Sequence, residues 1–304
     1  MSSADVSPPL PAVLVFAGSD PTGGAGLQAD LLTLASLGCH PLTVVTAITA
    51  QDTGGVQDFW PVEAEIIAQQ ARSVLEDIPV AAIKIGMIGS TEAVAAIAEV
   101  VSDYPDIPLV LDPVLASGRG DPLGDEDLVA ALRDLLLPQT TVLTPNSLEA
   151  RRLVEDLDEA FDDEEEDDED DDDDDDGERD GDDEDAADDA GPLPLRQCAR
   201  QLIDLGCEYV LITGAHEQGA DVSNTLYNSR GEVNRLNWDR LPGSYHGSGC
   251  TLASAVAAYL ALGLDVAEAA KEAQEYTYQA LKHAFRPGMG QFVPDRLFWA
   301  RDDD

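Results

Sequence analysis

The sequence has few positive charges and no basic cluster. Among its 304 residues, Lys and Arg total 17 while Asp and Glu total 61, which gives a formal net charge of -44 at pH 7. The only lysines are Lys84, Lys271 and Lys282. Sequence-independent binding to nucleic acid or to an anionic membrane needs clustered cations. The composition therefore excludes both kinds of partner.

Cysteine pairs and long apolar segments are also missing. The four cysteines, Cys39, Cys198, Cys207 and Cys250, show neither paired nor metal-ligand spacing, so we expect reduced thiols. The first residues lack the basic and apolar regions of a signal peptide. The apolar segment 252–264 is too short to cross a bilayer and is typical of a core helix. We therefore expect a cytoplasmic protein that does not enter a membrane.

Two common site motifs are absent as well. No Gly-x-x-x-x-Gly-Lys-[Ser/Thr] segment occurs, which excludes a P-loop nucleotide site. The histidines are far apart in the sequence, and each is expected to have a packed or surface role rather than to join a metal cluster. They are His40, His216, His246 and His283.

Acidic residues are concentrated in one stretch. Residues 155–189 contain 27 acidic residues and one basic residue, Arg179, while the rest of the chain still has about twice as many acidic as basic residues. Such a stretch repels itself and cannot form a core. We interpret about 155–190 as a solvated insert without specific function, rather than as a tail that binds a metal or a partner. The acidic remainder and the shortage of lysine suggest a further hypothesis, halophilic adaptation.

Short apolar runs alternate with longer helical patterns along the chain. This alternation is typical of an α/β fold whose mainly parallel sheet is covered by helices on both faces. The length allows one large domain or two small ones, and we interpret residues 1–304 as a single domain that carries the insert. The predicted strands are 12–17, 42–50, 81–87, 108–112, 141–144, 209–213 and 225–227, and the predicted helices are 26–37, 63–76, 91–102, 125–136, 195–205, 249–261 and 266–283.

Glycine and unusual polar residues fall where the predicted strands end. In doubly wound sheets the ligand crevice lies outside the carboxyl ends of the strands. We therefore expect these residues, distant in sequence, to meet at one cleft. They are Gly18, Gln51, Gly86, Met87, Asp112, Asn146 and Gly214.

The segment 18–30, GSDPTGGAGLQAD, follows the first predicted strand. Its glycines permit close backbone approach to a ligand, and Asp30 lies about one turn into the next helix, where its oxygens can accept from an amine or hydroxyl. The alternative is a turn followed by an ordinary acidic residue at a helix start. Residues 24–29 also match a dinucleotide fingerprint, but they begin several residues beyond the strand and no acid ends the next strand at the expected distance.

The segment 245–251, YHGSGCT, precedes a long helix of small residues. Two glycines at a helix start leave backbone N–H groups free to bind an anion, as in a site for a phosphoryl group in transfer. Cys250 lies at the mouth of this helix, where we expect the helix dipole to lower its thiol pKa. The alternative is that the glycines only permit close helix packing.

Asp112, Asn146 and Glu149 supply oxygen ligands of the kind that Mg²⁺ prefers. Asn146 and Glu149 are three residues apart and therefore share one helix face. Together with Asp112 they could hold hydrated Mg²⁺ beside ATP phosphates. The alternative is a capping box, in which Asn146 caps a helix and Glu149 completes the cap.

Taken together, these segments resemble the hydroxymethylpyrimidine/phosphomethylpyrimidine kinase family of thiamine biosynthesis, within the ribokinase-like superfamily. The matches occur in family order and cover most of the chain except the acidic insert and the termini. They are AGSDPTGGAGLQAD at 17–30, TAITAQDTGGVQ at 46–57, IKIGMIGS at 83–90, LDPVLASGRGDPL at 111–123, TPNSLEA at 144–150, LITGAH at 211–216 and GSYHGSGCTLASA at 243–255.

This resemblance implies a fold, an activity and partners. The fold would be a ribokinase-like three-layer α/β/α sandwich. The activity would be ATP-dependent and Mg²⁺-dependent phosphorylation of 4-amino-5-hydroxymethyl-2-methylpyrimidine and then of its monophosphate, by in-line transfer. The chain would act as a homodimer.

The resemblance also implies roles for individual residues in the substrate half of the site. The aminopyrimidine edge would be recognised by Gly18, Asp30 and Gln51, and the ring would be lined by Met87 and Val114. The alcohol would be activated by Cys250, next to an anion hole made of Gly247, Ser248 and Gly249.

Other residues are implied on the nucleotide side. Asp112, Asn146 and Glu149 would organise Mg²⁺ and the ATP phosphates, and Thr213 and Gly214 would border the nucleotide. Many family members have lysine where Thr213 stands, and another in the segment matching 116–120, where this chain has Arg119. Phosphate charge would then be met by Arg119, Mg²⁺ and backbone dipoles.

Two other functions fit parts of the pattern. Pyridoxal kinase shares the superfamily, and its substrate is also a hydroxymethyl heteroaromatic, although Gln51 with Asp30 favours an aminopyrimidine. A non-catalytic pyrimidine-binding sensor is the second alternative. The carboxylates Asp112 and Glu149 and the glycine-rich helix start argue against a sensor.

Overall fold

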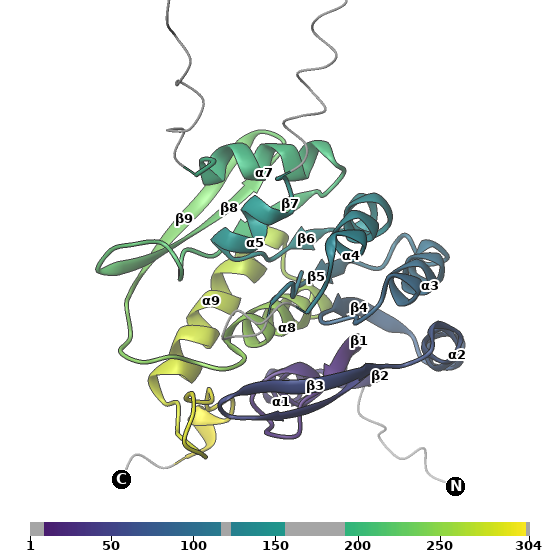
Figure 1. Cartoon of the computed structure of the whole chain (residues 1–304), viewed down its shortest axis with the longest axis horizontal. Coiled ribbons are helices and arrows are strands. Elements are labelled where there is room, and N and C mark those ends of the chain that lie inside the picture. Colours follow the sequence, from purple (N-terminus) through teal and green to yellow (C-terminus); the bar gives the residue numbers. More distant parts are fainter. Residues whose placement is uncertain (1–8, 117–122, 156–191, 302–304) are drawn as a thin grey trace, which may run out of the picture.

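The computed structural model describes residues 9–116, 123–155 and 192–301. Arg119, and the predicted acidic insert beyond Glu155, lie outside the described residues. Within the described ranges, nine strands form one sheet in the order β3-β2-β1-β4-β5-β6-β7-β8-β9 (Figure 1). In this part of the chain, no helix combines the length and the apolar character that crossing a bilayer requires.

The elements alternate along the chain as the apolar pattern predicts. The strands are β1 Ala12–Ser19, β2 His40–Asp52, β3 Gly55–Pro61, β4 Val80–Ile85, β5 Leu109–Leu111, β6 Val142–Leu143, β7 Tyr209–Ile212, β8 Asp221–Asn228 and β9 Gly231–Asp239. The helices are α1 Gly26–Ser36, α2 Ala64–Leu75, α3 Thr91–Ser102, α4 Glu126–Ala131, α5 Ser147–Arg152, α7 Leu195–Asp204, α8 Ser248–Ala261 and α9 Val266–Lys282.

The middle of the sheet is parallel and its edges are antiparallel. The parallel part runs in the order β2-β1-β4-β5-β6-β7, whereas β3 pairs antiparallel with β2, and β8 and β9 extend the other edge in the same way. Parallel neighbours need crossover connections, which the helices supply. All six parallel strands therefore end at the same edge of the sheet.

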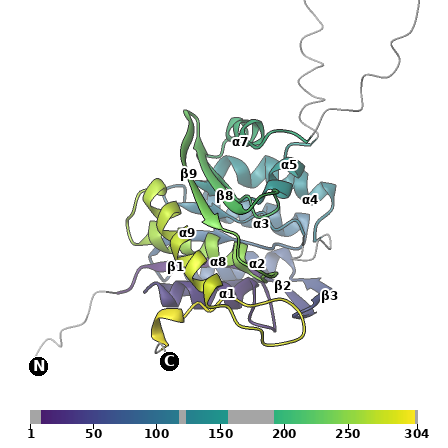
Figure 2. The same cartoon turned by 90° about the vertical axis from the view of Figure 1, so that its left-hand side faces the viewer.

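Strand β1 explains why helices cover both faces. Its residues are apolar without interruption from Ala12 to Ala17 and alternate between two cores. Leu14 and Phe16 share one core with residues of α2, α3, α4 and α7, whereas Val13 and Val15 share the other with residues of α1, α8 and α9. These two groups of helices lie on opposite sides of the sheet (Figure 1 and Figure 2). A strand that buries both faces reads as a continuous apolar run. The predicted three-layer α/β/α sandwich is confirmed.

Some elements differ from the prediction. The edge strands β3 and β9 were not predicted, and β2 extends to Asp52, so Gln51 lies inside a strand rather than after it. The pairing with β3 supplies the hydrogen bonds that prolong β2. The helix predicted at 125–136 divides into α4 and a π-helical stretch, Leu132–Leu136.

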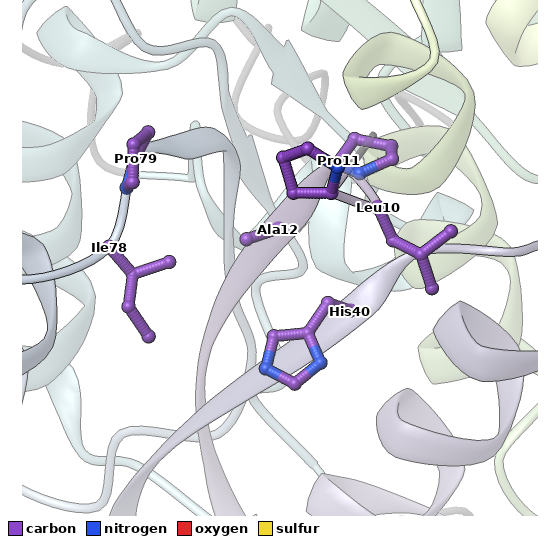
Figure 3. Close-up of a pocket in the computed structure, with 7 residues that line it drawn as sticks. Leu10, Pro11, Ala12, His40, Ile78 and Pro79 are labelled. Carbon is purple, nitrogen blue, oxygen red and sulfur yellow. The ribbon is translucent and has the colours of Figure 1, made fainter. Parts of the chain in front are cut away.

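An apolar surface pocket lies far from the carboxyl ends of the strands. It is lined by Pro9, Leu10, Pro11, Ala12, His40, Ile78 and Pro79 (Figure 3). Ala12 and His40 begin β1 and β2, and Pro79 precedes β4. The pocket is therefore at the amino ends of these strands, on the edge of the sheet opposite to the one where the predicted site residues gather.

Candidate active site

The end of β1 and the start of α1 approach each other through two glycines. Gly26 has a φ of +56°, and a Cβ at this position would lie 2.3 Å from the Gly18 carbonyl oxygen. The register of β1 against β2 shifts between Ala17 and Gly18. A Cβ on Gly18 would lie 3.2 Å from Met87 Sδ, so Gly18 and Met87 are neighbours, as predicted for the substrate half of the site.

Gln51 is tied to the same region by a chain of hydrogen bonds. Its Nε2 donates to Thr49 Oγ1 at 2.8 Å, and this hydroxyl donates to the Ser19 carbonyl at 2.7 Å. Ser19 is the last residue of β1. The end of β2 is therefore fastened to the end of β1, next to Gly18.

The loop between β1 and α1 is organised around the buried Asp20 carboxylate. Asp20 accepts from the Thr22 and Ala25 backbone N–H groups at 2.8 and 2.7 Å, and its Oδ2 lies 2.8 Å from His246 Nε2. Burial raises the pKa of Asp20, but the hydrogen bonds from His246, Thr22 and Ala25 outweigh burial and leave the pKa lowered. His246 thus has a packed role, as predicted, and joins this loop to the segment before α8.

Arg296 also joins the loop between β1 and α1 to the segment before α8. Its buried guanidinium donates to the carbonyls of Gly23, Gly24 and Gly247 and, at 3.0 Å, to the Thr251 hydroxyl. Several carbonyls around one planar cation hold both loops in a fixed arrangement. No motif marks Arg296 in the sequence, because its acceptors are backbone atoms far away along the chain.

The start of α8 has the geometry predicted for an anion hole. Gly247 caps the helix with a φ of +85°, and a Cβ here would lie 1.9 Å from the Gly24 carbonyl oxygen. The Thr251 N–H donates to the Gly247 carbonyl and closes the first turn. The N–H groups of Ser248 and Gly249 precede that turn, so the helix itself offers them no acceptor. A Cβ on Gly249 would lie 3.8 Å from Asp112 Oδ1, which brings Asp112 to this helix start.

Cys250 is packed between α1 and Asp112, and this packing overturns the predicted change in its pKa. Burial raises the pKa of the thiol to about 12; Lys84 and the Gly26 N–H oppose the rise, and the carboxylates of Asp112 and Asp30 add to it. The helix dipole favours a thiolate, but desolvation and two nearby negative charges outweigh it. Cys250 is therefore a neutral thiol at pH 7.

Asp112 and Glu149 form a pair of carboxyl groups near the start of α8. Burial, and then the charge of Asp112, raise the pKa of Glu149 to about 8, although the N–H groups of Asn146 and Leu115 counteract part of the rise. Burial also raises the pKa of Asp112, against the effect of Lys84. Asp112 Oδ2 is buried and accepts no hydrogen bond within the described residues, although Lys84 Nζ forms an ion pair with it at 3.8 Å. Two neighbouring carboxyl groups, one of them with an oxygen that accepts no hydrogen bond, have the chemistry of a divalent-cation site.

The capping alternative for Asn146 and Glu149 is confirmed. Asn146 Oδ1 accepts from the Leu148 and Glu149 N–H groups, and Glu149 Oε2 accepts from the Asn146 N–H, each at 2.9 Å. The capping box fixes the Glu149 carboxyl group next to Asp112. The Asp112 oxygens take no part in the capping box.

The nucleotide half of the predicted site follows β6 and β7. Asn146 forms a parallel bridge with Thr213. The Gly214 N–H donates to Asn224 Oδ1 at 3.1 Å, and a Cβ on Gly214 would lie 2.3 Å from the Ser223 carbonyl oxygen. Asn146, Thr213 and Gly214 are therefore close together beside the carboxyl pair.

Comparison with known proteins identifies the family. The profile of the family described as phosphomethylpyrimidine kinase matches residues 20–172 and 190–295, which is most of the chain. The chain belongs to the phosphomethylpyrimidine kinase family. It is 39% identical to the hydroxymethylpyrimidine/phosphomethylpyrimidine kinase of Streptomyces coelicolor over 94% of this chain and 93% of that protein. The kinase of the same name from Escherichia coli is 34% identical over 89% of this chain and 91% of its own length.

Solved structures of related kinases share the fold. Phosphomethylpyrimidine kinase from Clostridium difficile has a TM-score of 0.68 at 30% identity and covers 89% of this chain and 99% of that one. An ADP complex of Bacillus subtilis pyridoxal kinase has a TM-score of 0.76 at 27% identity, over 96% of this chain and 99% of that one. Staphylococcus aureus pyridoxal kinase in complex with AMP-PCP and pyridoxal has a TM-score of 0.76 at 28% identity, over 96% of each chain. The pyridoxal kinases are structural neighbours of this phosphomethylpyrimidine kinase family member.

Most of the residues predicted for this kinase lie at or just after the carboxyl ends of the parallel strands, or at the start of α8. They are Gly18, Gln51, Met87, Asp112, Val114, Asn146, Glu149, Thr213, Gly214, Gly247, Ser248, Gly249 and Cys250. Asp30 differs, because its side chain is fully buried and accepts hydrogen bonds from Lys84 and Ser254. Lys84, Asp20 and Arg296 also belong to this region, although they were not predicted from the sequence.

Proposed function

We propose that this chain uses ATP to phosphorylate 4-amino-5-hydroxymethyl-2-methylpyrimidine and then its monophosphate, as its family membership implies. The observation that carries the proposal is the start of α8, where the left-handed backbone of Gly247 presents the first N–H groups of a helix beside Asp112. This arrangement suits an anion with a bound cation, which is what phosphoryl transfer requires. The partners that we propose are the pyrimidine, ATP and, on family resemblance alone, a second copy of the chain.

On the substrate side, we assign the pyrimidine to the ends of β1, β2 and β4. Gly18 permits close backbone approach, Gln51 offers amide groups to the aminopyrimidine edge, and Met87 and Val114 line the ring. Gln51 suits this role because an amide can donate and accept at once. Since Asp30 is buried against Lys84, we assign it an indirect role in place of the predicted contact with the substrate.

The transfer itself needs positioning and charge stabilisation. The N–H groups of Ser248 and Gly249 would hold the charge of the migrating phosphoryl group. The Cys250 thiol would orient the acceptor hydroxyl by hydrogen bonding. A strong base is not needed, since the transition state of phosphoryl transfer is loose, and a thiol with a pKa of about 12 does not supply one.

Asp112 and Glu149 fit a magnesium ion, and Asn146, Thr213 and Gly214 would border the nucleotide. Magnesium is usually held by one or two carboxylates together with water and substrate phosphates. The pair of carboxyl groups matches this requirement. When bound, the ion would neutralise charge on the phosphates.

A coupled assay of ADP release tests the proposed function. The purified full chain with ATP and Mg²⁺ would receive the pyrimidine alcohol, its monophosphate or pyridoxal in parallel reactions. We expect release with both pyrimidines and a kcat/KM at least about 10-fold lower with pyridoxal, because the Gln51 amide assigned to the substrate can donate to and accept from an aminopyrimidine edge. Preference for pyridoxal would support the pyridoxal kinase alternative. Binding of pyrimidine without ADP release from any substrate would support a sensor.

Arg119 should matter most for the second phosphorylation. With only three lysines in the chain, we propose that Arg119 meets the charge of the substrate monophosphate. Arg119→Ala should then lower kcat/KM for the monophosphate by about 10–100-fold, since charged hydrogen bonds contribute about 1.5–3 kcal/mol, and change the value for the alcohol by less than about 3-fold. Steady-state kinetics with both substrates would measure this, with the exposed Arg230→Ala as the control. Equal losses for the two substrates would contradict the assignment.

A further inference from the structure

Lys84 is placed where lysine is rarely found. It lies on β4 with its side chain fully buried, while the other two lysines, Lys271 and Lys282, are exposed. Burial of an ammonium group costs several kcal/mol unless other groups compensate its charge. In a chain so poor in lysine, the surroundings of this one need an explanation.

Two carboxylates lie next to the ammonium group, and a hydroxyl donates to one of them. Lys84 Nζ lies 3.1 Å from both carboxylate oxygens of Asp30 and 3.8 Å from Asp112 Oδ2. Ser254 Oγ donates to Asp30 Oδ1 at 2.6 Å. A Cβ on Gly86 would lie 2.6 Å from Nζ, so this glycine leaves room for the ammonium group. Lys84 therefore links β4 to α1 through Asp30 and to the end of β5 through Asp112, and Ser254 joins Asp30 in turn to α8.

These contacts adjoin the residues that we assign to phosphoryl transfer. Ser254 and Cys250 are four residues apart on α8 and therefore share a helix face. Gly249, at the start of the same helix, is next to Asp112. The ammonium group is thus close to the thiol, the anion hole and the proposed cation ligand. The Asp30 and Lys84 side chains are buried and do not reach the surface of the cleft.

We propose that Lys84, anchored by Asp30 and Ser254, is a positioning residue for phosphoryl transfer, which holds the Asp112 carboxylate against the start of α8. This inference rests on the proposed function. Lys84 acts through Asp112 and touches no substrate. Asp30 serves as its anchor, which accounts for a carboxylate that occurs in a glycine-rich substrate loop but does not face the substrate.

The distribution of charge distinguishes this role from that of a simple buried ion pair. The cluster has one ammonium group and two carboxylates, so one negative charge remains. Lys84→Met would leave two unpaired buried carboxylates. The double variant Lys84→Met with Asp30→Asn has the wild-type net charge again. It lacks the ammonium group that pairs with the Asp112 carboxylate. Stability and catalysis should therefore respond differently to the double variant.

The experiment compares Lys84→Met, the double variant and the control Lys271→Met, which makes the same change on the exposed face of α9. Each full-length protein is assayed for kcat and KM with the pyrimidine alcohol, and its unfolding midpoint is measured. We expect Lys84→Met to be destabilised and the double variant to regain most of that stability. Both should have a kcat about 100-fold below wild type, because a misplacement of about 1 Å can cost this much, with KM for the pyrimidine within about 3-fold.

Each other outcome has a defined meaning. A double variant with near-wild-type kcat would overturn the proposal, since the pair would then be only structural. A double variant that cannot fold would also overturn it, because the pair would be needed for the fold itself. A KM raised more than about 10-fold would indicate contact with the substrate and contradict a positioning role. Absence of ADP release by the wild-type protein would instead refute the proposed function.

Discussion

Gly247→Ala should lower kcat for the pyrimidine alcohol by about 10²–10³, the loss expected when donors to a developing anion are misplaced. The new Cβ would lie 1.9 Å from the Gly24 carbonyl oxygen and 2.9 Å from Arg296 Nη2. Neither neighbour can move easily, because Arg296 is buried and joins both loops. The start of α8 must therefore shift, and its N–H groups would no longer point at the phosphoryl group.

Gly263→Ala is the matched control for backbone strain. Gly263 follows the end of the same helix with a φ of +91°, close to the +85° of Gly247, and a Cβ there would meet no atom within 4 Å. A left-handed backbone at a non-glycine residue costs roughly 1–2 kcal/mol, so both variants should lose stability by at least this amount. Only Gly247→Ala should lose kcat, measured per folded protein. Equal kcat values for the two variants would contradict the anion-hole assignment.

The candidate site can be predicted from the sequence where its signals are local. The glycines at 26 and 247 occur where two backbone segments approach closely, so a Cβ at either position would collide with a backbone carbonyl. The parallel strands are equally readable, since burial of both faces requires an unbroken apolar run such as that of β1. The edge strands β3 and β9 are different, because their exposed residues need no apolar pattern.

The partners of charged groups could not be read from the sequence. Asp30 occurs in a loop that matches the family's substrate segment, yet its partner is Lys84, 54 positions away on another strand. The pKa of Cys250 was predicted from the helix start alone. Its surroundings, with Asp112 and Asp30 nearby in a buried position, reverse the direction of the pKa change. The combined effect of burial and neighbouring charges on a pKa exists only in the folded chain.

Glu149→Gln should change activity and stability in opposite directions. The substitution removes a proposed magnesium ligand, and we expect kcat to fall by about 100-fold, a loss typical when the environment of a catalytic metal is disturbed. Gln retains an oxygen that can accept from the Asn146 N–H, so the capping box can persist. Any loss of activity then follows from the missing charge rather than from the helix start.

The stability change follows from the raised pKa of Glu149, about 8 in the folded chain against 4.5 ordinarily. The folded state binds this proton more tightly than the unfolded state, so the free energy of unfolding falls as pH rises from about 4.5 and levels off above about 8. Each tenfold change in proton affinity corresponds to about 1.4 kcal/mol. Without Mg²⁺, the Gln variant should therefore exceed wild type at pH 8–9 by a few kcal/mol and differ little near pH 4.5.

Chemical unfolding in EDTA at pH 5 and pH 8 would measure this difference, and repetition with Mg²⁺ would test its origin. If Asp112 and Glu149 hold a divalent ion, its charge would offset the cost of ionising both groups, so Mg²⁺ should stabilise wild type at pH 8 more than the Gln variant. Glu126→Gln is the control, because it removes an exposed carboxylate paired with Arg152 on the surface. If wild type and Glu149→Gln responded alike to pH and to Mg²⁺, Glu149 would be a capping residue only, and the cation would need other ligands.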